Sequence, residues 1–453
     1  MASFEVWGHW WLPERAHVRL PGRLVVDPVH GAHLTLIGAL REVTDVVQWV
    51  HDENGSSAAI GEDDLEAAGT YARILGDAEG QLFTLDDGVQ LSVRGPMLGA
   101  SFRQRVHVRY VYQGTHFLAD EPATATTVIL QPAGLNTWVA HSAITGSINP
   151  ESRALSLQGA PLPVQSAALD SGATVELRHH LGTPRYTDEG VHIPESFAIA
   201  VTCPDPVPVR ELIAIASDIQ DLISIATGRP AAFDSLSLRH PDVSRAAPAV
   251  PGIPEAVAES RYPLPIELFA RWTVTSAPQE RPLGVGDLYF TLEQLGGLDG
   301  VARWLNTVRR HRSTLGRVMS TRRANRGPLH DHYLDRLAPV EGMDTLEHGR
   351  GTTFRERILR SAREAGATMA ALLGGRHDRW AAKLTKDRND MAHHKGIRLN
   401  DELSEQYFLS ESAYWLYVLR LLRMAQAPEA VFDQIAEHRK SAYLKRQLSK
   451  ILQ

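Results

Sequence analysis

The stretch that decides the fold of the C-terminal part runs from Leu403 to Met424 and reads LSEQYFLSESAYWLYVLRLLRM. Its aromatic and aliphatic residues recur at helical spacing over several turns. The sequence therefore predicts a long apolar helix as the last member of a four-helix bundle. The three helices expected before it are Val301–Arg323, Phe354–Leu373 and Arg379–Lys395, the last of which stops at Gly396. Short tail helices are expected after Pro428.

Residues 1–205 show a different pattern, with short alternating or β-branched runs separated by turn residues such as Asp86-Asp87-Gly88. Such spacing predicts an antiparallel sandwich or a barrel-like sheet. The pattern becomes helical over Val209–Thr227, and Pro241–Pro265 has the composition of a connector. The predicted strands are Arg23–Asp27, His33–Ile37, Tyr71–Leu75, Val89–Val93, Val106–Tyr112, Ala125–Leu130, Thr174–His179 and Ala198–Thr202.

The fold class predicted from these patterns is α+β. We expect a β-rich N-terminal domain over residues 1–205, a helical segment and connector over 206–285, and an all-α bundle over 286–453. A chain of 453 residues exceeds one compact core, which agrees with more than one domain.

Composition indicates where in the cell the protein is expected. Cys203 is the single cysteine, so an intrachain disulfide and a cysteine-based metal site are excluded. No segment approaches the roughly 18 uninterrupted apolar residues of a membrane span, and the first residues lack the pattern of a secretory signal. A cytoplasmic protein without a membrane partner is expected.

Charge is divided unevenly along the chain. Residues 1–285 carry 19 arginines, no lysine and 33 acidic residues, a net −14, whereas residues 286–453 carry a net +8. This asymmetry indicates a polyanionic partner for the basic part. The alternative is that the acidic part covers the basic part within the molecule.

One helix carries the polar residues with the clearest chemistry. On the predicted helix Arg379–Lys395, Arg388 interrupts the apolar row of Trp380, Leu384 and Met391. An unpaired charge there is costly, and a phosphate or carboxylate would stabilise it. At about 100° per residue, Asn389 and His393 lie on the same side of the helix. Cleavage of a ribose phosphodiester needs a base for the 2′-hydroxyl and a cation for the phosphorane, and these groups supply both without a metal.

The segment Arg388-Asn389-x-x-x-His393 resembles the R-x₄₋₆-H signature of HEPN ribonucleases. The whole chain resembles ApeA-type anti-phage HEPN proteins, whose β-rich N-terminal domain opens with a "W-x-L-P" stretch and a "G-x-L" strand. The matching segments here are Trp10-Trp11-Leu12-Pro13 and Gly22-Arg23-Leu24, followed by Leu34-x-Leu36-x-Gly38.

This resemblance implies a homodimer through the HEPN domain that cleaves RNA, with tRNA one candidate, and leaves a 2′,3′-cyclic phosphate. It implies that His393 acts on the 2′-oxygen, Arg388 stabilises the phosphorane and Asn389 orients the phosphate. His394 is a possible substitute for His393, and Glu341 a possible partner of Arg388. No cofactor or metal is expected. The N-terminal domain would sense an unknown phage-derived trigger.

Other interpretations stay open at this stage. Arg388 could be a structural arginine paired with Asp387, Asp390 or Glu341, and the protein could then be a non-catalytic nucleotide- or RNA-binding protein. His330 and His332 have the spacing of two metal ligands but lack a third. Basic residues that could follow an RNA backbone, or only form a solvated face, are Arg309, Arg310, Arg312 and Lys395. For Trp7, Trp10 and Trp11, packing in the core of the first strands is favoured over a recognition surface.

Overall fold

The structure is a computed structural model, and the chain forms two compact units. The first consists of Met1–Gln131, Val201–Ile213 and Ala232–Thr275, and the second of Pro132–Ala200, Ala214–Ala231 and Ser276–Gln453. Each unit is built from three separate segments of the chain, so it has no single boundary in sequence. The domain boundaries predicted at residues 205 and 285 therefore stay predictions. The residues described are 3–27, 29–41, 48–52, 55–59, 69–94, 103–117, 121–160, 162–188, 190–246, 261–271, 282–323, 328–392 and 401–453.

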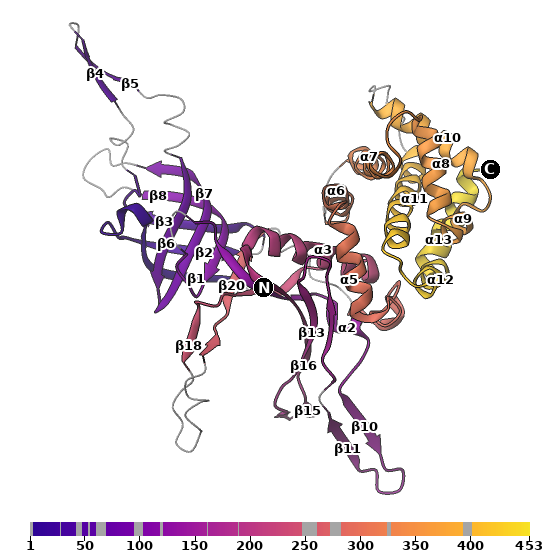
Figure 1. The fold of residues 1–453 in the computed structure, drawn as a ribbon, viewed down its shortest axis with the longest axis horizontal. Coiled ribbons are helices and arrows are strands. Elements are labelled where there is room, and N and C mark those ends of the chain that lie inside the picture. Colours follow the sequence, from indigo (N-terminus) through magenta and orange to yellow (C-terminus); the bar gives the residue numbers. More distant parts are fainter. Residues whose placement is uncertain are drawn as a thin grey trace. The chain divides into compact units, whose positions relative to one another are not determined.

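The first unit contains a closed barrel of six antiparallel strands (Figure 1). The order is β8-β3-β2-β1-β6-β7, and β7 pairs back with β8 to close the barrel. A register shift between Gln90 and Ser92 interrupts the β7–β8 pairing, an irregularity of the kind that bends a strand in a closed sheet. The strands are β1 (Phe4–Trp11), β2 (Leu20–Asp27), β3 (Gly31–Ile37), β6 (Thr70–Ala78), β7 (Gln81–Arg94) and β8 (Arg103–Gln113).

The interior of the barrel is apolar and centred on Trp10. This side chain is fully buried among leucine, valine and phenylalanine residues of the other barrel strands. Its pairing partner on β6 is Gly76, where an added Cβ would lie 2.2 Å from the indole ring. Trp11 is also buried, whereas Trp7 is exposed beside the Arg23 guanidinium. The prediction of core packing is therefore correct for Trp10 and Trp11 and wrong for Trp7.

Three further strands extend the sheet of the first unit from β8, in the order β20, β17 and β9. They are β20 (Ile266–Ala270), β17 (Phe233–Arg239) and β9 (Thr124–Pro132). Two short hairpins pair β4 (Gln48–Asp52) with β5 (Gly55–Ala59) and β18 (Ser244–Ala246) with β19 (Arg261–Pro263). The last hairpin lies within the predicted connector Pro241–Pro265, whose residues 247–260 are outside the described part of the chain.

The second unit contains strands as well as helices. Strand β13 (Thr174–Leu181) lies between β12 (Gln165–Ala168) and β16 (Glu195–Pro208), whose residues from Val201 onward belong to the first unit. Two hairpins pair β10 (Ile144–Ile148) with β11 (Leu155–Gly159) and β14 (Arg185–Thr187) with β15 (Gly190–His192). Each of the eight strands predicted from the sequence lies within an observed strand or overlaps one. The predicted helix is α3 (Val209–Thr227), and α2 (Leu135–Val139) is a short additional helix.

The chain from residue 297 onward is helical, which confirms the α+β class. The long apolar segment forms α11 (Asp401–Met424), which packs against α5, α7, α8, α9 and α13. The helices are α5 (Gly297–Val308), α6 (Arg312–Arg323), α7 (Leu329–His348), α8 (Phe354–Glu364), α9 (Ala367–Leu373), α10 (His377–Ala392), α11, α12 (Glu429–Glu437) and α13 (Arg439–Ile451).

Two helices predicted as continuous are each divided. The chain turns at residues 309–311 between α5 and α6, and at 365–366 between α8 and α9. Gly366 adopts a φ of +81°, which a right-handed helix does not allow. Helix α7, by contrast, continues through Pro339. Among the described residues, no helix has the length and apolar character required to cross a membrane.

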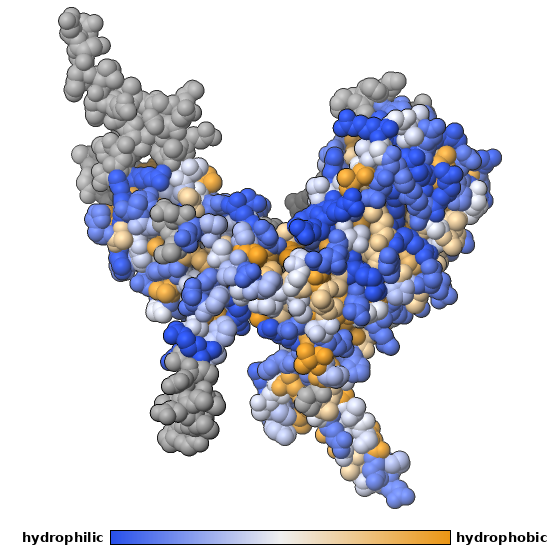
Figure 2. Space-filling view, viewed as in Figure 1, coloured by the Kyte–Doolittle hydropathy of each residue, from blue (hydrophilic) through white to orange (hydrophobic). Residues whose placement is uncertain are grey.

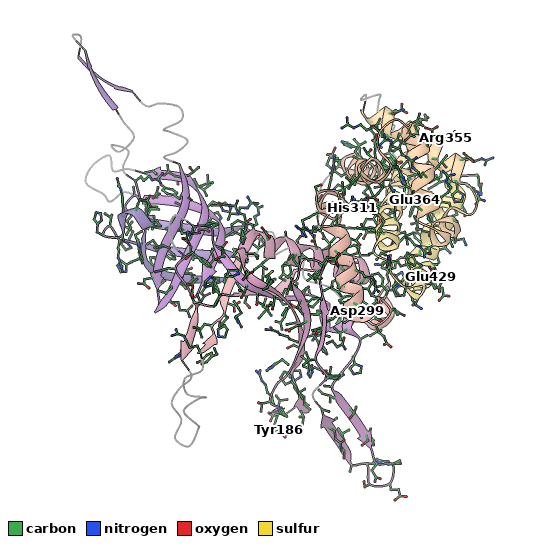
Figure 3. The ribbon with its side chains drawn as sticks, viewed as in Figure 1. Tyr186, Asp299, His311, Arg355, Glu364 and Glu429 are labelled. Atoms are coloured by element: carbon green, nitrogen blue, oxygen red, sulfur yellow. The ribbon has the colours of Figure 1, made fainter. Side chains whose placement is uncertain are left out.

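Buried charges join α7, α8 and α11 inside the second unit. Asp344 is fully buried and accepts hydrogen bonds from Arg360 at 2.9 and 2.6 Å. Arg420 is almost fully buried, with its guanidinium 2.6 Å from Glu364 and 3.8 Å from Asp344. Glu364 is labelled in Figure 3. These pairs balance charges that would otherwise be costly inside the bundle.

Candidate active site

The candidate site lies at the C-terminal end of α10. This helix begins after Gly374 and Gly375, and its first turns bury Trp380 and Leu384. The Trp380 indole N–H donates a hydrogen bond to Ser412 Oγ on α11 at 2.9 Å, which fixes the helix on the bundle. The next position of the inward row is Arg388, whose side chain is 38% exposed. The apolar row thus gives way to a guanidinium at the rim of the bundle.

Three groups hold the Arg388 guanidinium. Its Nη2 lies 3.3 Å from Glu341 Oε2 on α7, and its Nη1 lies 3.4 Å from the Asn389 amide oxygen. The centre of the guanidinium is 5.2 Å from the centre of the Phe354 ring, at the start of α8. Glu341 is itself one-third exposed. The cation is therefore oriented by its neighbours but stays accessible to a ligand from solvent.

The neighbouring carboxylate, Asp387, has a separate partner. The Tyr333 hydroxyl donates a hydrogen bond to Asp387 Oδ2 at 3.2 Å. Burial raises the pKa of Asp387 above its ordinary value, and burial followed by the charge of Asp387 raises the pKa of Tyr333. Of the three acidic partners considered for Arg388, the one that contacts it is therefore Glu341.

The other predicted residues of this segment differ in how far the structure describes them. Asn389 is exposed beside Arg388. His393, His394 and Lys395 follow directly after α10 and lie outside the described residues, as does Gly396. The structure therefore brings together Arg388, Asn389 and Glu341, and it leaves the position of the imidazole open.

The predicted basic face divides into exposed and paired arginines. Arg309 and Arg310 are exposed between α5 and α6. Arg312 instead makes a two-pronged ion pair with the buried Asp218 of α3, with Nη2 2.6 Å from Oδ2. Arg323 pairs with the buried Asp221, which lies about one helical turn after Asp218 on α3. One of the cations expected for RNA contact, Arg312, is thus neutralised within the second unit, and so is Arg323. The visible surface of the helical region is otherwise largely hydrophilic (Figure 2).

Sequence reasoning missed two contributors to this site. Phe354 and Tyr333 lie 34 and 55 residues before Arg388 in the sequence. Phe354 was visible only as the first residue of an amphipathic segment, and no local pattern relates Tyr333 to Asp387. His330 and His332, at the start of α7, gain no third ligand among the described residues, which hold no group of three potential metal-binding side chains.

The architecture defines a class of protein in which a β-barrel region precedes a helical region that fits a HEPN domain. The ApeA N-terminal domain 1 family matches residues 5–296 of the chain. The chain therefore belongs to the ApeA family, and this membership indicates a role in anti-phage defence. No curated protein and no solved structure matches the sequence.

Proposed function

We propose that the protein is a metal-independent endoribonuclease of the HEPN type that acts in anti-phage defence. His393 takes the proton from a ribose 2′-hydroxyl, and the 2′-oxygen attacks the adjacent phosphorus. The bond to the 5′-oxygen breaks, and the departing oxygen takes up a proton. The products are a 2′,3′-cyclic phosphate and a 5′-hydroxyl. General acid–base catalysis contributes about 10²–10⁴-fold to such a step.

Arg388 has the role of stabilising charge on the pentacoordinate phosphorus, and Asn389 that of orienting the phosphate. The observation that carries the proposal is the placement of Arg388, a guanidinium oriented by Glu341 and Phe354 yet more than one-third exposed. A phosphate oxygen would accept from the N–H groups of the guanidinium that do not face the Glu341 carboxylate. One preorganised donor of this kind contributes about 10²–10³-fold to turnover.

The test is cleavage of RNA by purified wild-type protein and by His393→Ala and Arg388→Ala variants. Each substitution is expected to reduce the cleavage rate by about 10²-fold or more. Arg355→Ala is the matched control, because Arg355 is likewise an exposed arginine of this bundle that pairs with a carboxylate, that of Asp378 (Figure 3). If wild type cleaves RNA and His393→Ala cleaves it at the same rate, the proposal is contradicted.

RNA binding distinguishes the nuclease from a non-catalytic binding protein. Under the nuclease proposal, His393→Ala abolishes cleavage but retains RNA binding. A binding protein would show no cleavage in any form, and Arg388→Ala would abolish its binding. A purely structural module would show neither activity.

The further parts of the proposal concern substrate, assembly and control. The substrate proposed is tRNA, the active form is a homodimer through the HEPN domain, and the N-terminal region responds to a phage-derived trigger. The trigger is tested by comparing RNA ends in cells before and after phage infection. Cleavage that is independent of infection at native expression levels would contradict control by a trigger.

A further inference from the structure

A second site of the helical unit lies in a pocket of about 220 Å³ that contains neither Arg388 nor Glu341. Its walls come from the segment after α3, from Tyr289, and from α6, α11 and α13. All of these segments belong to the same compact unit. The pocket is smaller than the roughly 300–1,000 Å³ typical for drug-sized ligands, which limits its occupant to a small molecule or to part of a larger one.

Aromatic rings form the mouth and one wall of this pocket. Tyr407 and Tyr443 are nearly half exposed, and Phe408 lies between them with ring centres 5.2 and 5.7 Å away. Deeper in the pocket, Tyr289 and Trp415 pack edge to face at 4.6 Å. The exposed Tyr407 and Tyr443 rings provide faces on which a planar ring can stack.

Cationic side chains also line the pocket. Arg322 lies 3.8 Å above the Tyr414 ring and donates a hydrogen bond to Glu411 at 2.7 Å. The same carboxylate accepts a hydrogen bond from Arg336 at 2.6 Å, so one anion is shared by two cations. Burial alone would raise the pKa of Glu411, but the two guanidiniums lower it, so this carboxylate stays ionised.

Lys440 adds a third cation. The part of the chain that the structure describes contains no acidic side chain within ion-pair distance of its ammonium. The ammonium lies close to the backbone of the segment after α3, since a Cβ added at Gly228 would be 3.4 Å from Nζ. Arg229 and Arg439 are nearby, and so is the carboxylate of Asp287, which pairs with Arg439. Burial followed by the charges of Arg322 and Arg229 lowers the pKa of Lys440. A bound anion would offset this repulsion.

We propose that this pocket binds a single nucleotide, with its base on the Tyr407 and Tyr443 rings and its phosphate at Lys440 and Arg322. Stacking surfaces and unbalanced positive charge within one small cavity match the two halves of a nucleotide. The inference does not rest on the proposed nuclease activity. The nucleotide could be free or part of an RNA strand, and the test separates these sources.

Binding is measured by calorimetry on the full chain with two kinds of probe. The first arm uses AMP, GMP, CMP and UMP, with adenosine and ribose 5-phosphate as half-ligands. The second arm uses a single-stranded 2′-O-methyl RNA, which lacks the free 2′-hydroxyl that cleavage requires. A mononucleotide is expected to bind more tightly than either half-ligand. If RNA binds but no mononucleotide does, and substitutions in the pocket weaken RNA binding, then the pocket binds a nucleotide that is part of an RNA strand.

Lys440→Ala is expected to weaken binding about tenfold, which corresponds to about 1.4 kcal/mol. Tyr443→Ala should weaken it by at least about fivefold, and Tyr443→Phe should retain binding because stacking needs only the ring. Lys450→Ala, on the same helix, and Tyr186→Ala, at an exposed tyrosine on β14, are the matched controls. Tyr186 is labelled in Figure 3.

Arg388→Ala separates this pocket from the proposed nuclease site. If the pocket is independent, Arg388→Ala retains nucleotide binding while it abolishes RNA cleavage. The inference is overturned if no probe binds in either arm, or if binding is equal in wild type, Lys440→Ala and Tyr443→Ala. A binding signal that only Arg388→Ala removes would likewise overturn it, since the ligand would then occupy the other site.

Discussion

The Arg388 guanidinium and the Glu341 carboxylate meet between α10 and α7, with 3.3 Å between Nη2 and Oε2, although the two residues are 47 positions apart in sequence. Both side chains are more than 30% exposed. An exposed pair of this kind contributes about 0–1 kcal/mol to stability. Its main consequence is therefore the orientation of the guanidinium, whose remaining N–H groups can donate to a substrate phosphate.

Replacing Glu341 by glutamine should impair catalysis more than stability. Without the carboxylate the guanidinium loses its orientation, so kcat for RNA cleavage is expected to fall about tenfold. KM should change little, because Arg388 itself is retained. The melting temperature should shift by less than about 4 °C. Steady-state kinetics and thermal unfolding measure both effects.

The matched control for this change is Glu429→Gln, which removes the carboxylate of another Arg–Glu pair, with Arg423 (Figure 3). It should leave kcat and KM unchanged. If Glu341→Gln and Glu429→Gln have the same kcat, Glu341 does not position Arg388 for catalysis.

Removing the buried charge of Asp344 should destabilise the helical unit strongly. Asp344→Asn takes away the carboxylate that faces Arg360 and Arg420, and a partner left with an uncompensated buried charge typically costs about 3–5 kcal/mol. Urea unfolding measures the loss. Asp378→Asn, at an exposed carboxylate, should change the free energy of unfolding by less than about 0.5 kcal/mol. Similar losses for both variants would show that burial of Asp344 has no energetic consequence.

Much of the fold could be predicted from sequence because its signals are local. Alternation within each barrel strand and the helical spacing of Val209–Thr227 and Leu403–Met424 depend on neighbouring residues alone. The division between α8 and α9 was missed because helices tolerate an isolated glycine, and only the positive φ of Gly366 reveals the end. Likewise, exposure of Trp7 depends on which face of β1 meets the barrel interior.

The candidate site was predictable only in part, because some of its contacts join residues that are far apart in sequence. Arg388 stands out because it interrupts an apolar row on its own helix. The ion pair between Arg312 and Asp218 joins residues 94 positions apart, and no spacing rule within either helix indicates it. It also bears on the alternative that acidic residues cover the basic part, since α3 neutralises two arginines of α6.

The carboxylates of α3 should give the second unit a characteristic pH dependence. Burial raises the pKa of Asp221 to about 7 from an ordinary value of 3.8, and burial raises that of Asp218 in the same direction. Between about pH 4 and 7 the folded state therefore binds more protons than the unfolded state. The free energy of unfolding should accordingly fall as pH rises through this window.

Urea unfolding of wild type and Asp221→Asn across this pH range tests the point. The amide cannot titrate, so the stability of the variant should fall less steeply with rising pH. The stability of Asp221→Asn relative to wild type should therefore increase from pH 5 to pH 7. Parallel pH profiles for the two proteins would contradict a raised pKa of Asp221.

The exposed and the paired arginines of the basic face should respond differently to substitution. The double variant Arg309→Ala/Arg310→Ala is expected to weaken RNA binding and to reduce the slope of log affinity against log salt by about 1–2. Stability should be retained, since both side chains are exposed. Arg312→Ala should instead lower the free energy of unfolding, because it leaves Asp218 buried without its partner. Salt-dependent RNA binding and urea unfolding distinguish the two outcomes.

RNA cleavage by Arg388 and His393 is the central claim, and mapping RNA ends in cells tests it most directly. RNA from phage-infected cells that express wild type, His393→Ala, Arg388→Ala or Arg355→Ala is sequenced with selection for 2′,3′-cyclic phosphates. We predict new cyclic-phosphate ends, concentrated at one kind of site in tRNA, with wild type and Arg355→Ala, and none with the other two variants. The same ends in all four samples, or no new ends with wild type during phage infection, would contradict the nuclease proposal.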